Sequence, residues 1–490
     1  MTRAVVCLLL LTCPVTANEK LTPQFRLTYD KTITTKPFTG RVFVMLSQRA
    51  KEPRTRLSPI RPDPVFAKDV KNWKAGETIT LSGEDLTYPR KFPELNSGSW
   101  NVQAVMDLDQ GYRKFSTAPG NGYSRTKKVD LDKTRTVKLH LDQIVKPTPF
   151  PETDRVKLVD IPSKLLSDFH KRVVRLQAGV ILPKSFKSNP KKRYPVIYEI
   201  PGFSGTHFGA LRAAKRNPTN VDGVEALYVV LNPSSRWGHH VFADSANNGP
   251  CGEALIKELI PYLEKKYRAI GNPGSRIVTG HSSGGWSSLW LQVTYPSFFG
   301  GVWSTSPDSV DFRAFQDSNI YTEKNIFFRD GKPIPLVRRG RTVMLSFRPY
   351  SDMDTIMGHG GQLGSFEAVF GPRGKDGRPV PLWDRKTGAI NPKIAQAWKK
   401  YDIRLILEQN WKRLAPLLKG KIHVYMGGMD TYHLDGATRL LKRSLENLES
   451  DAVVEIFPGR SHNLLDKSIR ARIAREMADQ FKKNRVAGSR

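Results

Sequence analysis

Residues 276–286 constrain the fold of this chain more strongly than any other stretch. The β-branched apolar run at 276–279 leads into the pentapeptide G-H-S-S-G at 280–284, and a helical pattern follows at once. Glycines at both ends of such a pentapeptide leave room for a tight strand-to-helix turn. Ser282 is then exposed at the end of a strand, and the amide of Ser283 lies at a helix N-terminus, where negative charge is stabilised. The pattern predicts an α/β fold with a nucleophilic serine.

The length and the N-terminal sequence predict an exported protein of two domains. At 490 residues the chain exceeds the size at which a single hydrophobic core keeps growing. Arg3, the apolar run 4–11 and the small-residue site 15–17 have the layout of a secretory signal peptide over residues 1–17. We therefore expect a secreted or periplasmic protein whose mature chain begins near Asn18.

One cysteine lies outside this predicted signal peptide. Cys7 and Cys13 fall within it, so Cys251 is the only thiol of the predicted mature chain and an intrachain disulfide framework is excluded. Cys13 could instead carry a lipid, but Thr12 before it is not the small residue that such a site favours. Cys251 stands at a predicted helix start, where a thiol can be activated. Because no base accompanies it in the same loop, we expect it to be a packed residue.

The chain carries a formal charge of +32, from 78 basic and 46 acidic residues. Such a surplus attracts anionic partners. The basic residues are dispersed, with short clusters at 187–193 and 482–485, and no nucleic-acid-binding motif accompanies them. We expect an acidic polysaccharide or an anionic cell surface as the partner, rather than nucleic acid. Equally, the positive charge could serve only to keep the protein soluble. No later apolar run reaches the length of about 18 residues that a membrane span requires.

Apolar and polar residues alternate along the first part of the chain. Phe25, Leu27 and Tyr29 alternate with polar neighbours, and the same period of two recurs at 100–108 and 137–141. This alternation is typical of half-buried strands. We therefore predict an N-terminal antiparallel β-sandwich domain over residues 18–146, followed by a stiff Pro-rich linker over residues 147–155.

After the linker, short apolar runs alternate with amphipathic segments, which indicates a mostly parallel sheet flanked by helices over residues 156–490. The clearest helix is predicted over 253–267. The predicted strands are 173–182, 195–200, 226–231, 275–279, 301–304, 422–426 and 453–457. An interval at about 305–420, rich in Gly, Pro and charge, is too long for a simple connection. We predict that it forms an excursion or lid over the strand ends.

A serine nucleophile needs a histidine base and an orienting carboxylate. In hydrolases of this architecture the chain order is serine, acid, histidine, each at the carboxyl end of a strand. Asp430 follows the predicted strand 422–426, and His462 follows the strand 453–457. We expect the two side chains on neighbouring loops, with Asp435 as the alternative acid. The other histidines weighed as the base, none of which occupies the expected loop, are His239, His240, His359, His423 and His433.

The loop after the predicted strand 195–200 should supply the second oxyanion donor beside the Ser283 amide. We expect the amide of Gly202 or Phe203 in this role, because Gly202 frees the backbone to turn inward. The residues expected to contact substrate are His207, Trp237 and His281, and His207 is equally compatible with an ordinary loop residue. Histidines and an aspartate at 239–244 invite a zinc interpretation, but their spacing matches no familiar ligand set. We predict no metal site.

Five motifs together resemble a known family. They are I-P-G-F-S-G at 200–205, E-A-L-I-K-E-L-I-P-Y-L-E-K-K-Y at 253–267, G-H-S-S-G-G-W at 280–286, G-G-M-D at 427–430 and P-G-R-S-H at 458–462. The chain resembles the esterase family that includes esterase D-type carboxylesterases, feruloyl and acetyl esterases, and mycolyltransferases, over about residues 152–320 and 415–485. The resemblance implies an α/β-hydrolase fold with Ser282 as nucleophile, Asp430 as acid and His462 as base. Many members carry a His-Gly pair where this chain has I-P-G, and the excursion at 305–420 is unusual.

These residues predict a serine esterase that acts through an acyl-enzyme, without a cofactor, on small esters or acylated carbohydrate. The alternatives are acyl transfer to an alcohol or sugar, a serine peptidase, and a non-catalytic binding or surface protein with a degenerate hydrolase domain. Because free histidine titrates near pH 6.5, roughly, we expect activity to fall at acid pH.

Overall fold

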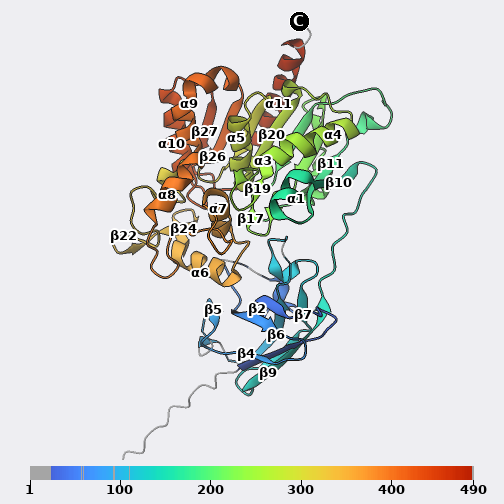
Figure 1. Ribbon diagram of the computed structural model, residues 1–490. Coiled ribbons are helices and arrows are strands. Elements are labelled where there is room, and N and C mark those ends of the chain that lie inside the picture. Colours follow the sequence, from blue (N-terminus) through green and yellow to red (C-terminus); the bar gives the residue numbers. More distant parts are fainter. Residues whose placement is uncertain are drawn as a thin grey trace, which may run out of the picture.

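The computed structural model describes residues 24–56, 58, 60–91, 94–95, 97–109 and 111–487. The signal peptide predicted over residues 1–17 lies outside the described residues. Figure 1 shows a smaller part built of strands and a larger part built of strands and helices, joined by an extended segment. That segment, where the linker is predicted, contains no helix or strand between Ile144 and Val156. Within the part of the chain just given, no helix is both long and apolar enough to span a membrane.

Nine strands form one sheet in the N-terminal part, in the order β4-β1-β9-β7-β6-β2-β3-β5, with β8 also paired to β6. They are β1 (Gln24–Tyr29), β2 (Phe38–Ser47), β3 (Val65–Trp73), β4 (Ile79–Leu81), β5 (Leu86–Tyr88), β6 (Ser99–Met106), β7 (Gly122–Ser124), β8 (Lys127–Asp130) and β9 (Thr136–Ile144). The predicted antiparallel pairing is wrong at one ladder, because β1 and β9 run parallel. These two strands are far apart in the chain, so no tight turn dictates their relative direction.

Strand β2 is buried on both of its faces. Val42 and Val44 join the main core of the N-terminal sheet, whereas Phe43 packs in a second cluster with Met353 of α6 (Phe347–Met357). Burial on both faces explains why this strand reads as a continuous apolar run instead of an alternating one. The second face of the N-terminal sheet is therefore covered by the larger part of the molecule, as the position of α6 in Figure 1 shows.

Eight strands form the central sheet of the larger part, in the order β10-β11-β15-β12-β20-β21-β26-β27. They are β10 (Val156–Ser163), β11 (Val174–Ile181), β12 (Val196–Ile200), β15 (Leu227–Leu231), β20 (Arg276–His281), β21 (Gly301–Thr305), β26 (Ile422–Gly427) and β27 (Val453–Phe457). The ladders from β15 to β27 are parallel, and β10 and β11 form an antiparallel edge. All seven predicted strands are confirmed. The additional strand β10 lies at the edge of the sheet, where a mixed sequence gives no clear period.

Helices cover both faces of this sheet. Val278 lies in a core cluster shared with α5, whereas its neighbour Ile277 packs with α11 on the opposite face. The helices are α1 (Lys164–His170), α2 (Gly209–Ala213), α3 (Cys251–Ala254), α4 (Ile260–Lys266), α5 (Ser283–Thr294), α6, α7 (Gln362–Phe370), α8 (Pro392–Trp398), α9 (Ile403–Leu418), α10 (Asp435–Asn447) and α11 (Lys467–Ala487). A π-helical turn at Leu255–Leu259 joins α3 to α4, so the helix predicted over 253–267 is confirmed.

Short two-stranded sheets lie in the connections between these elements. They are β13 (Asn220–Val221) with β14 (Val224–Glu225), β16 (Ser234–Ser235) with β17 (Gly238–His239), β18 (Asp244–Ser245) with β19 (Gly249–Pro250), β22 (Phe328–Arg329) with β23 (Lys332–Pro333), and β24 (Pro335–Arg339) with β25 (Thr342–Ser346). The last two pairs belong to the predicted excursion.

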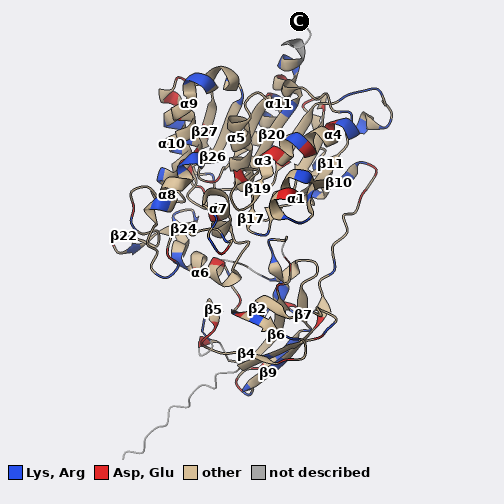
Figure 2. Cartoon of the chain, in the orientation of Figure 1, with Lys and Arg blue, Asp and Glu red and all other residues tan. Residues whose placement is uncertain are grey.

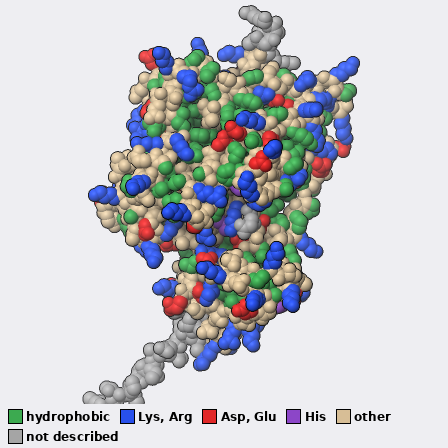
Figure 3. Space-filling view, viewed as in Figure 1, with side chains coloured by type: hydrophobic (Ala, Val, Ile, Leu, Met, Phe, Trp, Pro, Cys, Tyr) green, Lys and Arg blue, Asp and Glu red, His purple; other side chains and the backbone are tan. Residues whose placement is uncertain are grey.

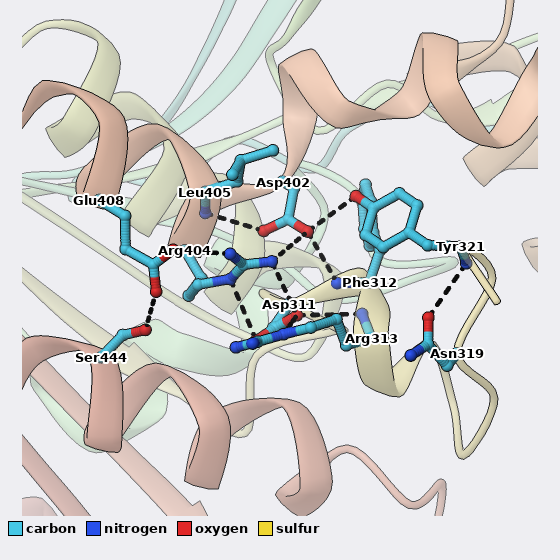
Figure 4. A network of polar contacts seen from close by, with 10 residues as sticks. All are labelled: Asp311, Phe312, Arg313, Asn319, Tyr321, Asp402, Arg404, Leu405, Glu408 and Ser444. Atoms are coloured by element: carbon cyan, nitrogen blue, oxygen red, sulfur yellow. Dashed lines mark hydrogen bonds and ion pairs between the residues drawn. The ribbon is translucent and has the colours of Figure 1, made fainter.

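The interval 305–420 leaves the central sheet after β21 and re-enters it at β26. Helices α6 and α7 lie between the sheet and the N-terminal part, and α9 returns to the level of α5 and α10 (Figure 1). Arg404 at the start of α9 contacts Asp311 at 3.2 Å and Asp402 at 3.4 Å, and both carboxylates are fully buried (Figure 4). These contacts join the start of the excursion, just after β21, to its end at α9.

Candidate active site

Ser282 lies at the turn between strand β20 and helix α5. Its φ of 60° and ψ of −125° fall in a backbone region that residues other than glycine rarely adopt. A Cβ atom on Gly280 would lie 2.1 Å from the carbonyl oxygen of Gly284, and one on Gly284 would lie 1.9 Å from the carbonyl oxygen of Ile200. Neither position accepts a side chain. The tight strand-to-helix turn predicted from the pentapeptide is therefore confirmed.

Asp430 and His462 meet on the loops that follow β26 and β27. Nδ1 of His462 lies 2.7 Å from Oδ2 of Asp430, whose side chain is fully buried. The other carboxylate oxygen accepts hydrogen bonds from the amides of Tyr432 at 2.8 Å and Leu434 at 3.4 Å. These bonds fix the carboxylate, and Nε2 is left as the ring nitrogen of His462 that can accept a proton.

Asp435, the alternative acid, has a different partner. It begins helix α10 and pairs with Arg338 of β24 at 2.7 Å. The same arginine donates through Nε to the carbonyl oxygen of Asp430, also at 2.7 Å. Arg338 thus links the excursion to the loop that carries Asp430, and the carboxylate in contact with His462 is that of Asp430.

A second buried acid, Asp308, lies beneath the serine. The hydroxyl of Ser282 donates to Oδ1 of Asp308 at 3.4 Å, and the hydroxyl of Ser283 donates to Oδ2 at 2.5 Å. Burial raises the pKa of Asp308 to about 6. Among the described residues, no hydrogen bond joins Ser282 to His462. Catalytic hydrogen bonds are often incomplete before substrate is bound.

The predicted oxyanion donors lie next to the serine. A Cβ on Gly202 would stand 3.2 Å from Cβ of Ser282, which places the loop after β12 directly against the nucleophile. The amide of Phe203 donates to no other group of the described chain. Ser283 is the first residue of α5, so its N–H has no partner inside the helix. Both amides are therefore available to a negatively charged oxygen.

The three residues predicted to contact substrate lie in different places. His281 lines the cavity above Ser282, and burial lowers its pKa to about 4, so this ring is neutral at pH 7. His207 is buried against Phe150 of the linker, with ring centroids 5.6 Å apart. Neither His207 nor Trp237 is among the described residues that line this cavity. Their positions give no support to a role in substrate contact.

The cavity above Ser282 has a volume of about 500 Å³ and is bounded by three regions of the chain. The loops of the central sheet supply one wall, the excursion supplies a second, and the N-terminal part supplies a third. The lining residues that the sequence did not single out include Arg113, Lys114, Phe115, Tyr350, Asp354 and Tyr432. Asp308 could have been identified from the sequence as a site residue, because it lies just beyond the end of the predicted strand 301–304. The loop residues of the N-terminal part carry no periodicity or motif that could have found them.

Of the remaining candidates for metal or thiol chemistry, His239, His240 and Cys251 are buried, whereas Asp244 is exposed. His239 bonds through Nε2 to the carbonyl oxygen of Pro201 at 2.8 Å, and burial lowers its pKa to about 4. Burial also raises the pKa of Cys251 strongly, which makes the thiol unreactive. Across the described residues, no group of three or more His, Cys, Asp or Glu side chains is arranged to hold a metal ion.

Comparison with solved structures finds similar chains of low sequence identity. A ferulic acid esterase is 15% identical with a TM-score of 0.43, and covers 67% of this chain and 98% of its own. An S-formylglutathione hydrolase from Agrobacterium tumefaciens is 11% identical with a TM-score of 0.41, and covers 69% and 97%. A dipeptidyl peptidase 4 from Porphyromonas gingivalis is 13% identical with a TM-score of 0.38, and covers 89% and 48%. No curated protein matches the sequence.

A family described as "Putative esterase" matches residues 174–462, which is more than half of the chain. The match begins at the first residue of β11 and ends at His462, so it includes the turn at Ser282 and the loop of Asp430. Outside it lie the N-terminal sheet, the linker and helix α11. The chain belongs to this esterase family and is a carboxylic ester hydrolase.

Proposed function

We propose that the protein hydrolyses carboxylic esters through a Ser282-His462-Asp430 triad and an acyl-enzyme intermediate. The observation that carries the proposal is the 2.7 Å contact between His462 and Asp430 at the cavity into which Ser282 projects. An imidazole held by a buried carboxylate through one nitrogen can take a proton through the other. A strained turn and a helix N-terminus at the serine support the same assignment.

The reaction follows from these positions. Nε2 of His462 removes the proton of the Ser282 hydroxyl as its oxygen attacks the ester carbonyl carbon, and the amides of Phe203 and Ser283 stabilise the oxyanion. The imidazolium, stabilised by Asp430, then donates its proton to the leaving alcohol. Water, deprotonated by the same imidazole, attacks the acyl-enzyme, and the acid is released as the serine regains its proton.

The replacement Ser282→Ala tests this proposal. We expect the turnover of a 4-nitrophenyl ester to fall by roughly 10³-fold or more, because the nucleophile is removed. Ser288→Ala is a matched control, because Ser288 is also a buried serine, lies within α5 and donates its hydroxyl to the carbonyl oxygen of Gly285. Retention of most activity in folded Ser282→Ala protein would refute the proposal.

We also infer the setting in which this enzyme works. The signal-like sequence at residues 1–17 supports export to a periplasm or the medium. The formal charge of +32 supports a polyanionic neighbourhood such as acidic polysaccharide, and acylated carbohydrate is the proposed natural ester. We propose domain limits of 18–146 and 156–490, with the N-terminal sheet folded as a β-sandwich around its main core.

A further inference from the structure

Residues 107–109 and 111–117 of the N-terminal part lie against the cavity and are held in place by several contacts. Oδ2 of Asp107 lies 2.6 Å from Nε2 of His359 in the excursion. Phe115 stacks on Phe43 of β2, with ring centroids 3.7 Å apart and an interplanar angle of 11°. The side chain of Asn121 donates to Asp107 and accepts hydrogen bonds from the amides of Leu108 and Asp109. The loop is thus held from both sides before any ligand arrives.

Arg113 brings a cation from this loop to the oxyanion loop. Its guanidinium carbon lies 4.6 Å from the ring centroid of Phe203, and its Nη1 donates to the carbonyl oxygen of Gly360 at 3.1 Å. No carboxylate of the described chain pairs with it. The lining acid Asp354 accepts the amide of Gly364 in α7 at 3.0 Å, and burial raises the pKa of this acid to about 6.

Lys114 adds a second cation to the same wall. Burial lowers the pKa of Lys114, and the charges of Arg113 and Arg54 lower it further. Within the described ranges its ammonium group makes no hydrogen bond or ion pair. Other Lys and Arg residues are distributed along both parts (Figure 2), and many lie on the face of the surface shown in Figure 3, where water compensates their charge. A partly buried cation without a partner is costly, and an anion that enters the cavity removes that cost.

Apolar side chains also line the cavity beside these cations. Phe115, Met353 and Met357 line the cavity together with Tyr350. Such walls accept an alkyl or aromatic body, while a guanidinium fork binds a planar oxyanion with two hydrogen bonds. We propose that Arg113 and Lys114 bind an anionic group of the substrate, so that the enzyme prefers esters that carry a carboxylate over neutral esters of the same size. This inference rests on the proposed function, because it concerns the same cavity.

A matched pair of chromogenic esters tests the preference. Mono-4-nitrophenyl adipate carries a terminal carboxylate, and 4-nitrophenyl hexanoate is its neutral counterpart with the same chain length. The measured quantity is the ratio of kcat/KM for adipate to kcat/KM for hexanoate at low ionic strength. We expect a ratio of about 10 or more for the wild-type enzyme, because one charge-assisted contact is worth about a factor of ten. A second pair, 3-carboxy-4-nitrophenyl butyrate and 4-nitrophenyl butyrate, places the carboxylate on the alcohol side.

Substitutions then assign the preference to the two cations. Lys114→Gln and Arg113→Gln are each expected to lower the ratio by about 3- to 10-fold, mainly through KM for the anionic ester. Arg113→Lys keeps the charge and should recover part of the lost preference. Lys138→Gln, on the exposed side of β9, removes the same charge far from the cavity and should leave the ratio unchanged. Thermal unfolding of each variant checks that it is folded.

The outcomes separate this inference from the proposed function. A wild-type ratio near one for both ester pairs overturns the inference and leaves ester hydrolysis standing. Folded Lys114→Gln and Arg113→Gln variants that both keep the wild-type ratio also overturn it. If the folded wild-type enzyme turns over neither member of either pair, the proposed function itself fails.

Discussion

The α/β part and the N-terminal part contribute to one cavity in different ways. The α/β part places Ser282, Asp430 and His462 just beyond the carboxyl ends of β20, β26 and β27, where one sheet fixes their backbones. The N-terminal part contributes the tip of one loop, Arg113 to Phe115, which other segments hold in place. Strand ends suit groups that must meet within hydrogen-bonding distance, and a docked loop suits groups that select the ligand. Under the two proposals above, the α/β part carries out the reaction and the loop of the N-terminal part selects the substrate.

The largest effect should come from the triad, which serves every substrate. Asp430→Asn is expected to lower kcat by about 10³- to 10⁴-fold for anionic and neutral esters alike, because the imidazole loses the group that orients it and stabilises its charge. Steady-state kinetics on the adipate and hexanoate esters measures this. Asp435→Asn is the control, since that carboxylate pairs with Arg338, and we expect a loss of less than about tenfold. Equal losses in both variants would contradict the assignment of the acid.

A smaller effect should come from the acid beneath the serine, and it concerns stability. Burial raises the pKa of Asp308 from its ordinary value of 3.8 to about 6, so the folded state holds this proton more tightly than the unfolded state. The wild-type protein should therefore lose stability as pH rises from about 4 to about 6, by roughly 2–3 kcal/mol from this group. Asn cannot titrate, so Asp308→Asn should gain stability relative to wild type over that range.

Urea unfolding at pH 4.5 and pH 7.5 measures this difference. Asp479→Asn removes one carboxylate at an exposed position of α11 and serves as the control. A difference in unfolding free energy between wild type and Asp308→Asn that stays constant with pH would show that burial of this acid has no energetic cost.

The smallest effect should come from the contact that holds the N-terminal loop. Asp107→Asn weakens the bond to His359 and leaves a buried donor poorly satisfied, at a cost of about 1–2 kcal/mol. If the two parts divide the work as described, KM for the adipate ester rises several-fold while kcat for the hexanoate ester changes little. Asp168→Asn removes one partner of an exposed ion pair on α1 and is the control for stability. A loss of kcat for both esters would mean that the loop supports the reaction as well as selectivity.

The sequence predicts the α/β part well, because its signals are periodic and local. The apolar runs mark all seven predicted strands, and the spacing of glycines around Ser282 marks the strand-to-helix turn. Chain order alone brings Asp430 and His462 to neighbouring loops, where the structure has them in contact. Each of these inferences uses the rule that parallel strands end at one edge of a sheet.

The sequence does not predict what depends on contacts between distant segments. Arg113 and Ser282 are separated in the sequence by roughly the length of a whole domain. No periodicity indicates that the loop of Arg113 enters the cavity. The parallel pairing of β1 with β9 has the same origin, since it joins the two ends of the N-terminal part. His207 follows Gly202 and Phe203 closely in sequence, yet it does not line the cavity and instead packs on Phe150.

Labelling with a fluorophosphonate probe tests most directly whether Ser282 is the activated nucleophile. The probe reacts with a serine only where a base accepts the proton and donors stabilise the oxygen. We predict that mass spectrometry of the digested wild-type protein finds the adduct on Ser282, and that His462→Ala slows labelling by about 10³-fold or more. Folded wild-type protein that stays unlabelled, or that carries the adduct on another serine, would contradict the account.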